Sequence, residues 1–151
     1  MSSQYNQHSV LLVENNQDDI LLTQRAFQKA KFTAELAVVE DGDLAIHYLN
    51  GYGQYSDRAR YPLPTLLLLD LKLPRRSGFE VIEWIRADTR MQRLPVVILS
   101  SSNQKRDINL AYKLGGNSYI VKPFGDHAFQ DMINKLGQYW FGINWPPQLQ
   151  H

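Results

Sequence analysis

The sequence contains no cysteine, which excludes a disulfide scaffold, a thiolate metal site and a cysteine nucleophile. No apolar run approaches the roughly 18 residues of a membrane span, and the polar N-terminus lacks the basic and then apolar order of a secretory signal. Basic and acidic side chains number 16 and 15, so the formal charge of +1 gives no bulk attraction to nucleic acid or to a membrane. These absences predict a soluble cytoplasmic protein that binds neither nucleic acid nor a membrane.

The 151 residues suffice for one hydrophobic core, because two halves of about 75 residues would each bury too little surface. We expect a single domain over residues 1–151, with a core at about 9–138 and an extension at 139–151. Only about a dozen residues follow the last expected helix, too few for a DNA-recognition helix and its support. The output is therefore expected to be a protein contact.

Five short apolar runs alternate with amphipathic segments. The runs are typical of strands that are buried on both faces, and they are Val10–Val13, Ala34–Val39, Thr65–Leu69, Val96–Leu99 and Ser118–Val121. The segments between and after them have helical periodicity, and they are Asp18–Lys31, Asp43–Leu49, Gly78–Arg90, Asn103–Leu114 and Asp126–Gln138. This alternation favours an α/β fold, a doubly wound five-stranded parallel sheet of the flavodoxin-like type.

Two segments stand outside this pattern. Residues 51–64 form a long, tyrosine-rich connection, which we interpret as a surface loop packed by its own tyrosines in preference to a partner-binding loop. The extension crowds five large apolar side chains into seven residues, and each costs roughly 1.5–3 kcal/mol if left in water; they are Tyr139, Trp140, Phe141, Ile143 and Trp145. They must cover this domain or another chain, and we favour a homodimer contact over self-packing.

Polar side chains follow four of the expected strands. Ligands of an open parallel sheet bind at the carboxyl ends of its strands, and the residues at those ends are Glu14, Asn15, Asp70, Ser100 and Lys122. The carboxylate and amide oxygens suit a hard cation such as Mg²⁺. The ammonium and the hydroxyl suit the oxygens of a phosphoryl group.

Taken singly, most of these residues have an ordinary structural explanation. An acidic residue such as Glu14 after a strand is often a cap or a turn, Ser100 is a candidate cap for the next helix, and Lys122 a solvated loop charge. Asp70 differs, because it follows the most apolar run and needs a nearby cation to offset its desolvation. The combination is more specific than its members.

At these positions the chain resembles the receiver domain of two-component response regulators. The resemblance covers about residues 9–138 and rests on four pieces in the family's order and spacing: Val10-Leu-Leu-Val-Glu-Asn15, Leu69-Asp-Leu-Lys-Leu-Pro74 with Gly78, Val96-Val-Ile-Leu-Ser100, and Tyr119-Ile-Val-Lys-Pro-Phe124. The tyrosine-rich connection and the aromatic extension look more narrowly like those of the stand-alone regulators paired with cyanobacterial phytochromes.

The resemblance implies a role for each site residue. Asp70 would accept a phosphoryl group from a sensor histidine kinase, Lys122 would pair with the aspartyl phosphate, and Ser100 would donate a hydrogen bond to it. Mg²⁺ would be held by Glu14, Asn15, Asp70 and the backbone carbonyl of Lys72. Tyr119 would be the switch aromatic that turns inward when Ser100 moves; without its neighbours we would interpret it as an edge-strand aromatic. Lys72 and Ser102 would tune hydrolysis of the acyl phosphate.

One position departs from the family's pattern. Receivers usually carry two acidic residues after the first strand, and Asn15 stands in place of the second. Its amide still offers an oxygen, but the lost charge predicts weaker Mg²⁺ binding. We expect the nearby Asp18 to cap the first helix, not to bind metal.

Three hypotheses follow. The first is a phosphoacceptor signalling protein, not an enzyme, which is phosphorylated on Asp70 by a phytochrome-type kinase and acts on an unknown downstream protein. The second is a degenerate pseudo-receiver that serves as a dimerisation or docking module, because of Asn15 and the aromatic extension. The third, an aspartyl-phosphate phosphatase, is disfavoured because neither Glu14-Asn15 nor Asp70-Leu71-Lys72 forms an Asp-x-Asp pair.

Overall fold

A parallel sheet of five strands, in the order β2-β1-β3-β4-β5, forms the centre of the structure, which is a computed structural model that describes residues 8–149. The strands are β1 (His8–Val13), β2 (Ala34–Val39), β3 (Leu66–Leu69), β4 (Val96–Ser100) and β5 (Ser118–Val121). The helices are α1 (Gln17–Ala30), α2 (Gly42–Asn50), α3 (Gly78–Ala87), α4 (Lys105–Leu114) and α5 (Asp126–Gly142), with a 3₁₀ turn, η2, at Gly53–Ser56. The predicted doubly wound α/β fold is confirmed.

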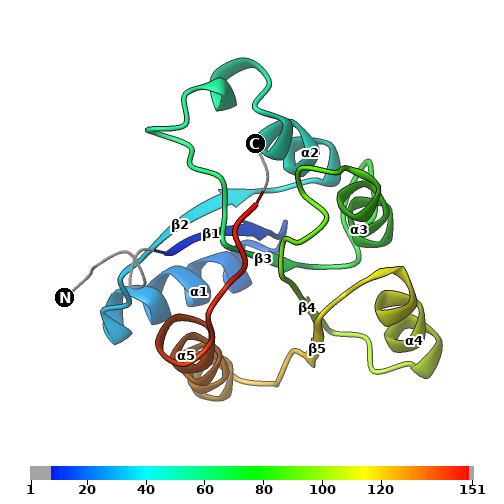
Figure 1. Ribbon diagram of the computed structural model, residues 1–151. Coiled ribbons are helices and arrows are strands. Elements are labelled where there is room, and N and C mark those ends of the chain that lie inside the picture. The colour runs from blue at the N-terminus through cyan, green and yellow to red at the C-terminus, as the bar shows by residue number, and fades with distance from the viewer. Residues whose placement is uncertain (1–7, 150–151) are drawn as a thin grey trace.

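The helices cover the two faces of the sheet in separate layers (Figure 1). Helices α1 and α5 lie on one face, and α2, α3 and α4 lie on the other. Successive side chains of β3 alternate between the faces: Leu66 and Leu68 pack toward α1 and α5, whereas Leu67 and Leu69 pack toward the other layer. Burial on both faces explains why the central strands have no polar alternation.

Three helix ends differ from the sequence prediction by two residues or more. Helix α3 ends at Ala87 because the Asp88 carboxylate accepts the backbone N–H of Arg90 and begins a turn. Helix α4 begins at Lys105, since the Ser102 hydroxyl accepts the N–H of Gln104 and holds the preceding residues in a turn. Helix α5 continues past the predicted end at Gln138 and finishes at Gly142.

The continuation of α5 places one aromatic residue of the extension inside the protein. Phe141 is buried, with its ring centroid 5.1–5.8 Å from those of His8, Phe27 and Phe32. Ile143 and Trp145 remain 67% exposed. The extension is thus divided between self-packing, which accounts for Phe141, and an exposed part.

Residues 51–64 form the self-packed connection that the sequence predicts. The Tyr55 ring is buried and packs against Tyr48 of α2 and against Tyr61, with centroid distances of 5.0 and 5.1 Å. The Arg58 guanidinium donates hydrogen bonds to the carbonyls of Tyr48, Leu49 and Tyr61.

Within residues 8–149, no helix is both apolar and long enough to cross a membrane.

Candidate functional site

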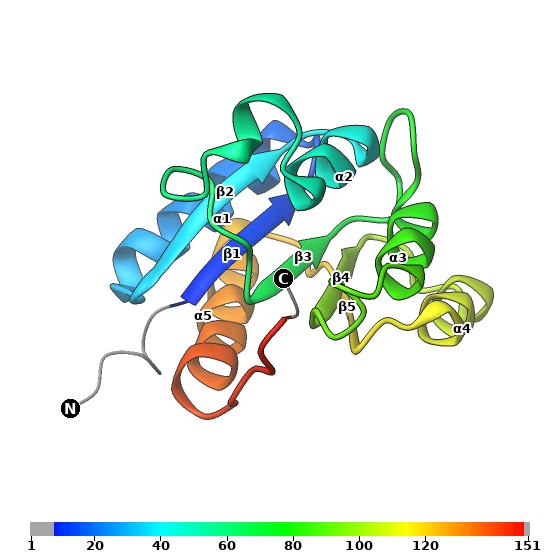
Figure 2. The same ribbon diagram turned by 45° about the horizontal axis from the view of Figure 1, so that its top comes forward.

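Four strand ends meet at one edge of the sheet and bring the predicted side chains together. Glu14 follows β1, Asp70 follows β3, Ser100 ends β4 and Lys122 follows β5. Glu14 and Asp70 are only 2% and 9% exposed, and Ser100 is buried as well. At the opposite edge of the sheet, where the strands begin, lie the first and the last described residues (Figure 2). The predicted site therefore exists as a spatial cluster.

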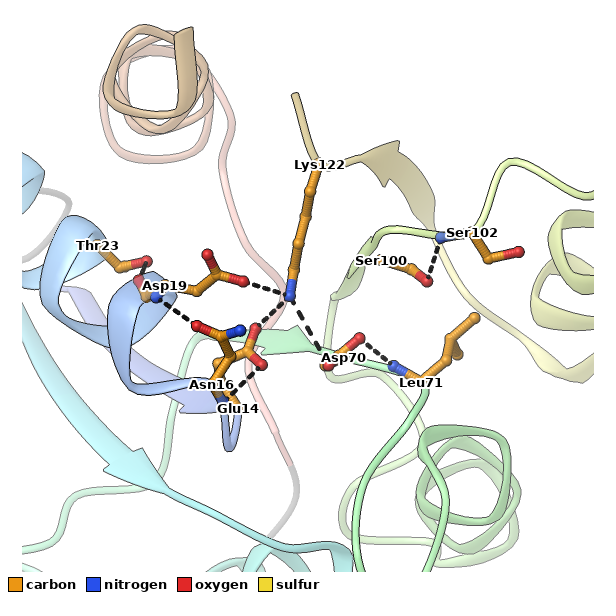
Figure 3. Close-up of polar contacts among 9 residues, drawn as sticks. All are labelled: Glu14, Asn16, Asp19, Thr23, Asp70, Leu71, Ser100, Ser102 and Lys122. Carbon is orange, nitrogen blue, oxygen red and sulfur yellow. Dashed lines mark hydrogen bonds and ion pairs between the residues drawn. The ribbon is translucent and has the colours of Figure 1, made fainter. Parts of the chain in front are cut away.

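Lys122 is the centre of this cluster (Figure 3). Its Nζ donates to Glu14 Oε1 at 2.7 Å and to Asp19 Oδ2 at 2.8 Å, and it lies 3.7 Å from Asp70 Oδ2. The ammonium lies between α1 on one side and the end of β3 on the other. It is closer to the carboxylates of β1 and α1 than to that of Asp70.

The Asp70 carboxylate is held by the backbone on its other oxygen. Asp70 Oδ1 accepts the N–H of Leu71 at 2.8 Å, which fixes the side chain at the carboxyl end of β3. Gly78 is needed beside it, because a Cβ at this position would lie 2.3 Å from the Asp70 carbonyl oxygen. The close approach of α3 to β3 thus supports the placement of Asp70.

Burial dominates the electrostatics of Glu14. Desolvation and, to a smaller extent, the negative charge of Asp70 raise the pKa of this carboxyl to about 7, although the hydrogen bond from Lys122 acts to lower it. Burial also acts to lower the pKa of Lys122, but hydrogen bonds to Asp19 and Glu14 and the charge of Asp70 outweigh it, so this pKa lies above its usual value. Lys122 is therefore charged, and three carboxyl groups lie within 3.7 Å of its Nζ.

The sequence prediction did not include Asp19. The N-cap of α1 is Asn16, whose side chain accepts the backbone N–H of Asp19, so the expectation that Asp18 caps this helix is wrong. Asp19 lies on the side of the first turn that faces Lys122, and Asp18 is exposed. Asn15 is also exposed.

Hydrogen bonds connect Ser100 to the loop between β4 and α4. Ser100 Oγ accepts the N–H of Ser102 at 3.1 Å, and the Ser102 hydroxyl donates to Asp107 Oδ2 at 2.6 Å. The Tyr119 hydroxyl donates to the Ser102 carbonyl at 2.8 Å, so Tyr119 contacts this loop directly. Ser100 does not cap α4, whose N-cap is Gln104. A cavity of about 250 Å³ lies beside the loop and is lined in part by Ser100, Ser102 and Lys72.

The donor set fits a magnesium ion. Within residues 8–149, no three His, Asp or Glu side chains are grouped as ligands of one metal. Mg²⁺ does not require such a group, because it keeps several waters and takes one or two carboxylates. Glu14 and Asp70 supply two carboxylates at one edge, and the amide of Asn15, next to Glu14 in the chain, and the carbonyl of Lys72, two residues after Asp70, offer further oxygens.

Comparison with known proteins gives a family match over most of the chain. The family model for the response regulator receiver domain matches residues 10–134. Response regulator Rcp1 of Synechocystis sp. is 33% identical over 131 residues, which cover 87% of this chain and 87% of Rcp1. The probable methanogenesis regulatory protein FilR2 of Methanothrix harundinacea is 34% identical over 138 residues, or 91% of this chain and 86% of FilR2.

Solved structures agree with these matches. The phosphorylated cyanobacterial phytochrome response regulator RcpA superposes with a TM-score of 0.88 at 34% identity, covering 94% of this chain and 99% of RcpA. The Mn²⁺-bound form of Rcp1 gives a TM-score of 0.85 at 31% identity, covering 93% of this chain and 99% of Rcp1. The resemblance identified from four short sequence pieces therefore extends over the whole fold.

Proposed function

Because this chain belongs to the response regulator receiver family, a family of signalling domains that take phosphoryl groups from histidine kinases, we propose that it is phosphorylated on Asp70. The observation that carries this proposal is the position of the Asp70 carboxylate. It is 9% exposed at the carboxyl end of a central strand, and the Lys122 ammonium lies 3.7 Å away. Phosphoryl transfer depends on such positioning and charge neutralisation.

Each of the chain's own residues has a part in this transfer. Asp70 attacks the phosphorus of a phosphohistidine, a new O–P bond forms as the N–P bond breaks, and the electron pair returns to the imidazole of the kinase. Lys122 pairs with the transferred phosphoryl oxygens. Ser100 releases the N–H of Ser102, and its hydroxyl donates a hydrogen bond to a phosphoryl oxygen. Tyr119 follows the loop to which it is bound.

Receiver domains generally bind Mg²⁺, and the Mn²⁺-bound Rcp1 structure is a divalent-metal complex of a relative. We assign its ligands here to Glu14, Asp70, the amide of Asn15 and the carbonyl of Lys72. When bound, the ion neutralises the charge that gathers on the phosphoryl oxygens. Asn15 supplies no charge of its own, so the affinity is expected to be lower than with an acidic residue in its place.

The kinase and the output belong to the same proposal. The similarity to the phytochrome response regulators Rcp1 and RcpA supports a phytochrome-type kinase as the donor. The exposed Ile143 and Trp145 support a homodimer that forms through the C-terminal extension. The second candidate function, a pseudo-receiver that docks without phosphorylation, is favoured by Asn15 and by the same exposed side chains of the extension.

Intact-protein mass spectrometry separates these two functions. After incubation with Mg²⁺ and a small acyl-phosphate donor, or with a cognate kinase, we expect a phosphoryl adduct on the wild-type protein. Asp70→Asn is the matched control and should carry no adduct. Absence of an adduct with both donors would contradict phosphorylation and favour the pseudo-receiver.

Light scattering tests the dimer. Because Phe141 is buried, the extension should not be truncated before it; Ile143 and Trp145 are exchanged instead, both for serine. We expect a dimer of the wild-type protein and a monomer of the double variant. A wild-type monomer, or a dimer that the exchange leaves intact, would exclude this interface.

A further inference from the structure

We propose that Asp19 is a positioning residue, which shares Lys122 with Glu14, holds the ammonium beyond hydrogen-bond distance of Asp70 and thereby leaves the Asp70 carboxylate available to a divalent cation. In this way Asp19 supplies the negative charge that Asn15 lacks. The inference deepens the proposed function and rests on it, since it takes Glu14 and Asp70 as ligands of Mg²⁺.

The distances around the ammonium carry this inference. Lys122 Nζ lies 2.7 Å from Glu14 Oε1 and 2.8 Å from Asp19 Oδ2, but 3.7 Å from Asp70 Oδ2, which is outside hydrogen-bond distance. An ammonium has three N–H donors. Asp19 takes one of them, so the charge of Lys122 is drawn toward α1 and the Asp70 oxygen remains without a direct hydrogen bond from it.

The first turn of α1 fixes Asp19 in this position. The side chain of Asn16 accepts the backbone N–H of Asp19, and the Thr23 hydroxyl donates to the Asp19 carbonyl at 2.7 Å (Figure 3). Thr23 is itself 1% exposed. Asp19 therefore comes from a rigid element, whereas the neighbouring Asp18 is exposed and makes none of the ion pairs of Lys122.

The ion pair between Asp19 and Lys122 affects the Mg²⁺ affinity through the balance of charge in the cluster. Without Asp19, the positive charge of Lys122 would fall on Glu14 and Asp70 alone, and it would oppose a second cation on the same two carboxylates. An acidic residue at position 15 would restore the lost charge next to Glu14. A single exchange at Asp19 should thus weaken Mg²⁺ binding, and a second exchange at Asn15 should compensate for it.

Calorimetric titration of Mg²⁺ into the full-length protein tests these expectations. Asp19→Asn should weaken Mg²⁺ binding about fivefold, as expected for the loss of one partly buried ion pair. Asp18→Asn removes the same charge from the same helical turn and is the matched control, with a change below about twofold. Asp19→Glu should restore most of the affinity, and Asn15→Asp should restore it in the Asp19→Asn background.

A double-mutant cycle with Lys122→Gln tests whether Asp19 acts through Lys122. In that background Asp19→Asn should have no larger effect on Mg²⁺ affinity than Asp18→Asn, because the residue through which Asp19 acts is gone. A general loss of structure would not depend on Lys122 in this way. Asp19→Ser serves as a second variant if Asp19→Asn fails to fold, and thermal unfolding checks each protein before titration.

The outcomes separate this inference from the proposed function. If the wild-type protein binds Mg²⁺ and takes the phosphoryl group but Asp19→Asn and Asp18→Asn weaken binding equally, the role of Asp19 is overturned and the proposed function stands. An effect of Asp19→Asn that persists in the Lys122→Gln background also overturns it. A wild-type protein that binds no Mg²⁺ and gains no phosphoryl adduct overturns both.

Discussion

Two partly buried cations tie the loops at opposite edges of the sheet, and their partners differ in kind. At the carboxyl edge, Lys122 is surrounded by the carboxylates of Glu14, Asp19 and Asp70. At the amino edge, Arg86 of α3 has no acidic partner within the described residues. Its guanidinium donates five hydrogen bonds to neutral oxygens: the carbonyls of Gln92, Leu94 and Gly115 (twice), and the side chain of Asn117.

The difference separates a structural cation from an exchangeable one. All five N–H donors of Arg86 bind oxygens that are neutral and belong to the protein itself. The Asn117 side chain also accepts the N–H of Val96, which links Arg86 to the start of β4. Lys122 shares one ammonium among three carboxyl groups, so under the proposed function a phosphoryl group could replace one of them with little rearrangement. We infer that the amino edge is built for rigidity, and the carboxyl edge for a change of charge.

The largest effect is expected at Arg86. Arg86→Ala leaves three backbone carbonyls and the Asn117 side chain without their donor, and should lower the free energy of unfolding by about 3 kcal/mol. Arg93→Ala, at an exposed arginine nearby in the sequence, is the control. The measurement is the urea midpoint of each variant. Equal midpoints would break the comparison, because Arg86 would then stabilise no more than a surface arginine.

The second effect is a pH dependence that comes from Glu14. The folded carboxyl has a pKa of about 7 and the ordinary value is 4.5, so between these values the folded protein holds a proton that the unfolded chain releases. The contribution of this bound proton to the stability of the folded protein is fully present below pH 4.5 and is lost as the pH rises through 7.

In a metal chelator, the free energy of unfolding should therefore fall by roughly 2 kcal/mol between about pH 5 and pH 7.5. Glu14→Gln should remove most of this slope, and urea titrations at the two pH values measure it. A wild-type protein whose stability does not change over this range would show that the carboxyl edge is no more sensitive to pH than the amino edge.

The smallest effect is expected at Tyr119. Tyr119→Phe removes the hydroxyl that donates to the Ser102 carbonyl and should cost about 1 kcal/mol. Amide hydrogen exchange should become faster in residues 101–104, and Tyr112→Phe, at an exposed tyrosine of α4, should leave it unchanged. Identical exchange in the two variants would mean that this loop is not held by Tyr119.

The sequence predicted the carboxyl edge far better than the amino edge. Glu14, Asp70 and Lys122 each follow a run of apolar residues, and parallel strands necessarily bring such positions together. Arg86 left no comparable signal, because its partners are backbone carbonyls that any residue type supplies. Its role depends on where three loops approach one another, which no local pattern encodes.

Asp19 shows a second limit of the sequence. Adjacent Asp18 and Asp19 both suit the first turn of a helix, and the choice between them depends on which residue is the cap. Asn16 is the cap, so neither aspartate serves in that role, and Asp19 instead binds Lys122. The course of the aromatic extension was equally hidden, since only the three-dimensional structure shows that Phe141 has a buried site while Trp145 has none.

The path of the extension has a practical consequence. Phe141 packs in the α1 and α5 layer and Leu149 packs against the other layer, so residues between them pass around the amino edge of the sheet (Figure 2). Because the chain has no cysteine, Gln148→Cys at an exposed position would give the protein a single thiol. A fluorophore attached there would report on assembly from the amino edge of the sheet and leave Asp70 open to the proposed phosphoryl donor.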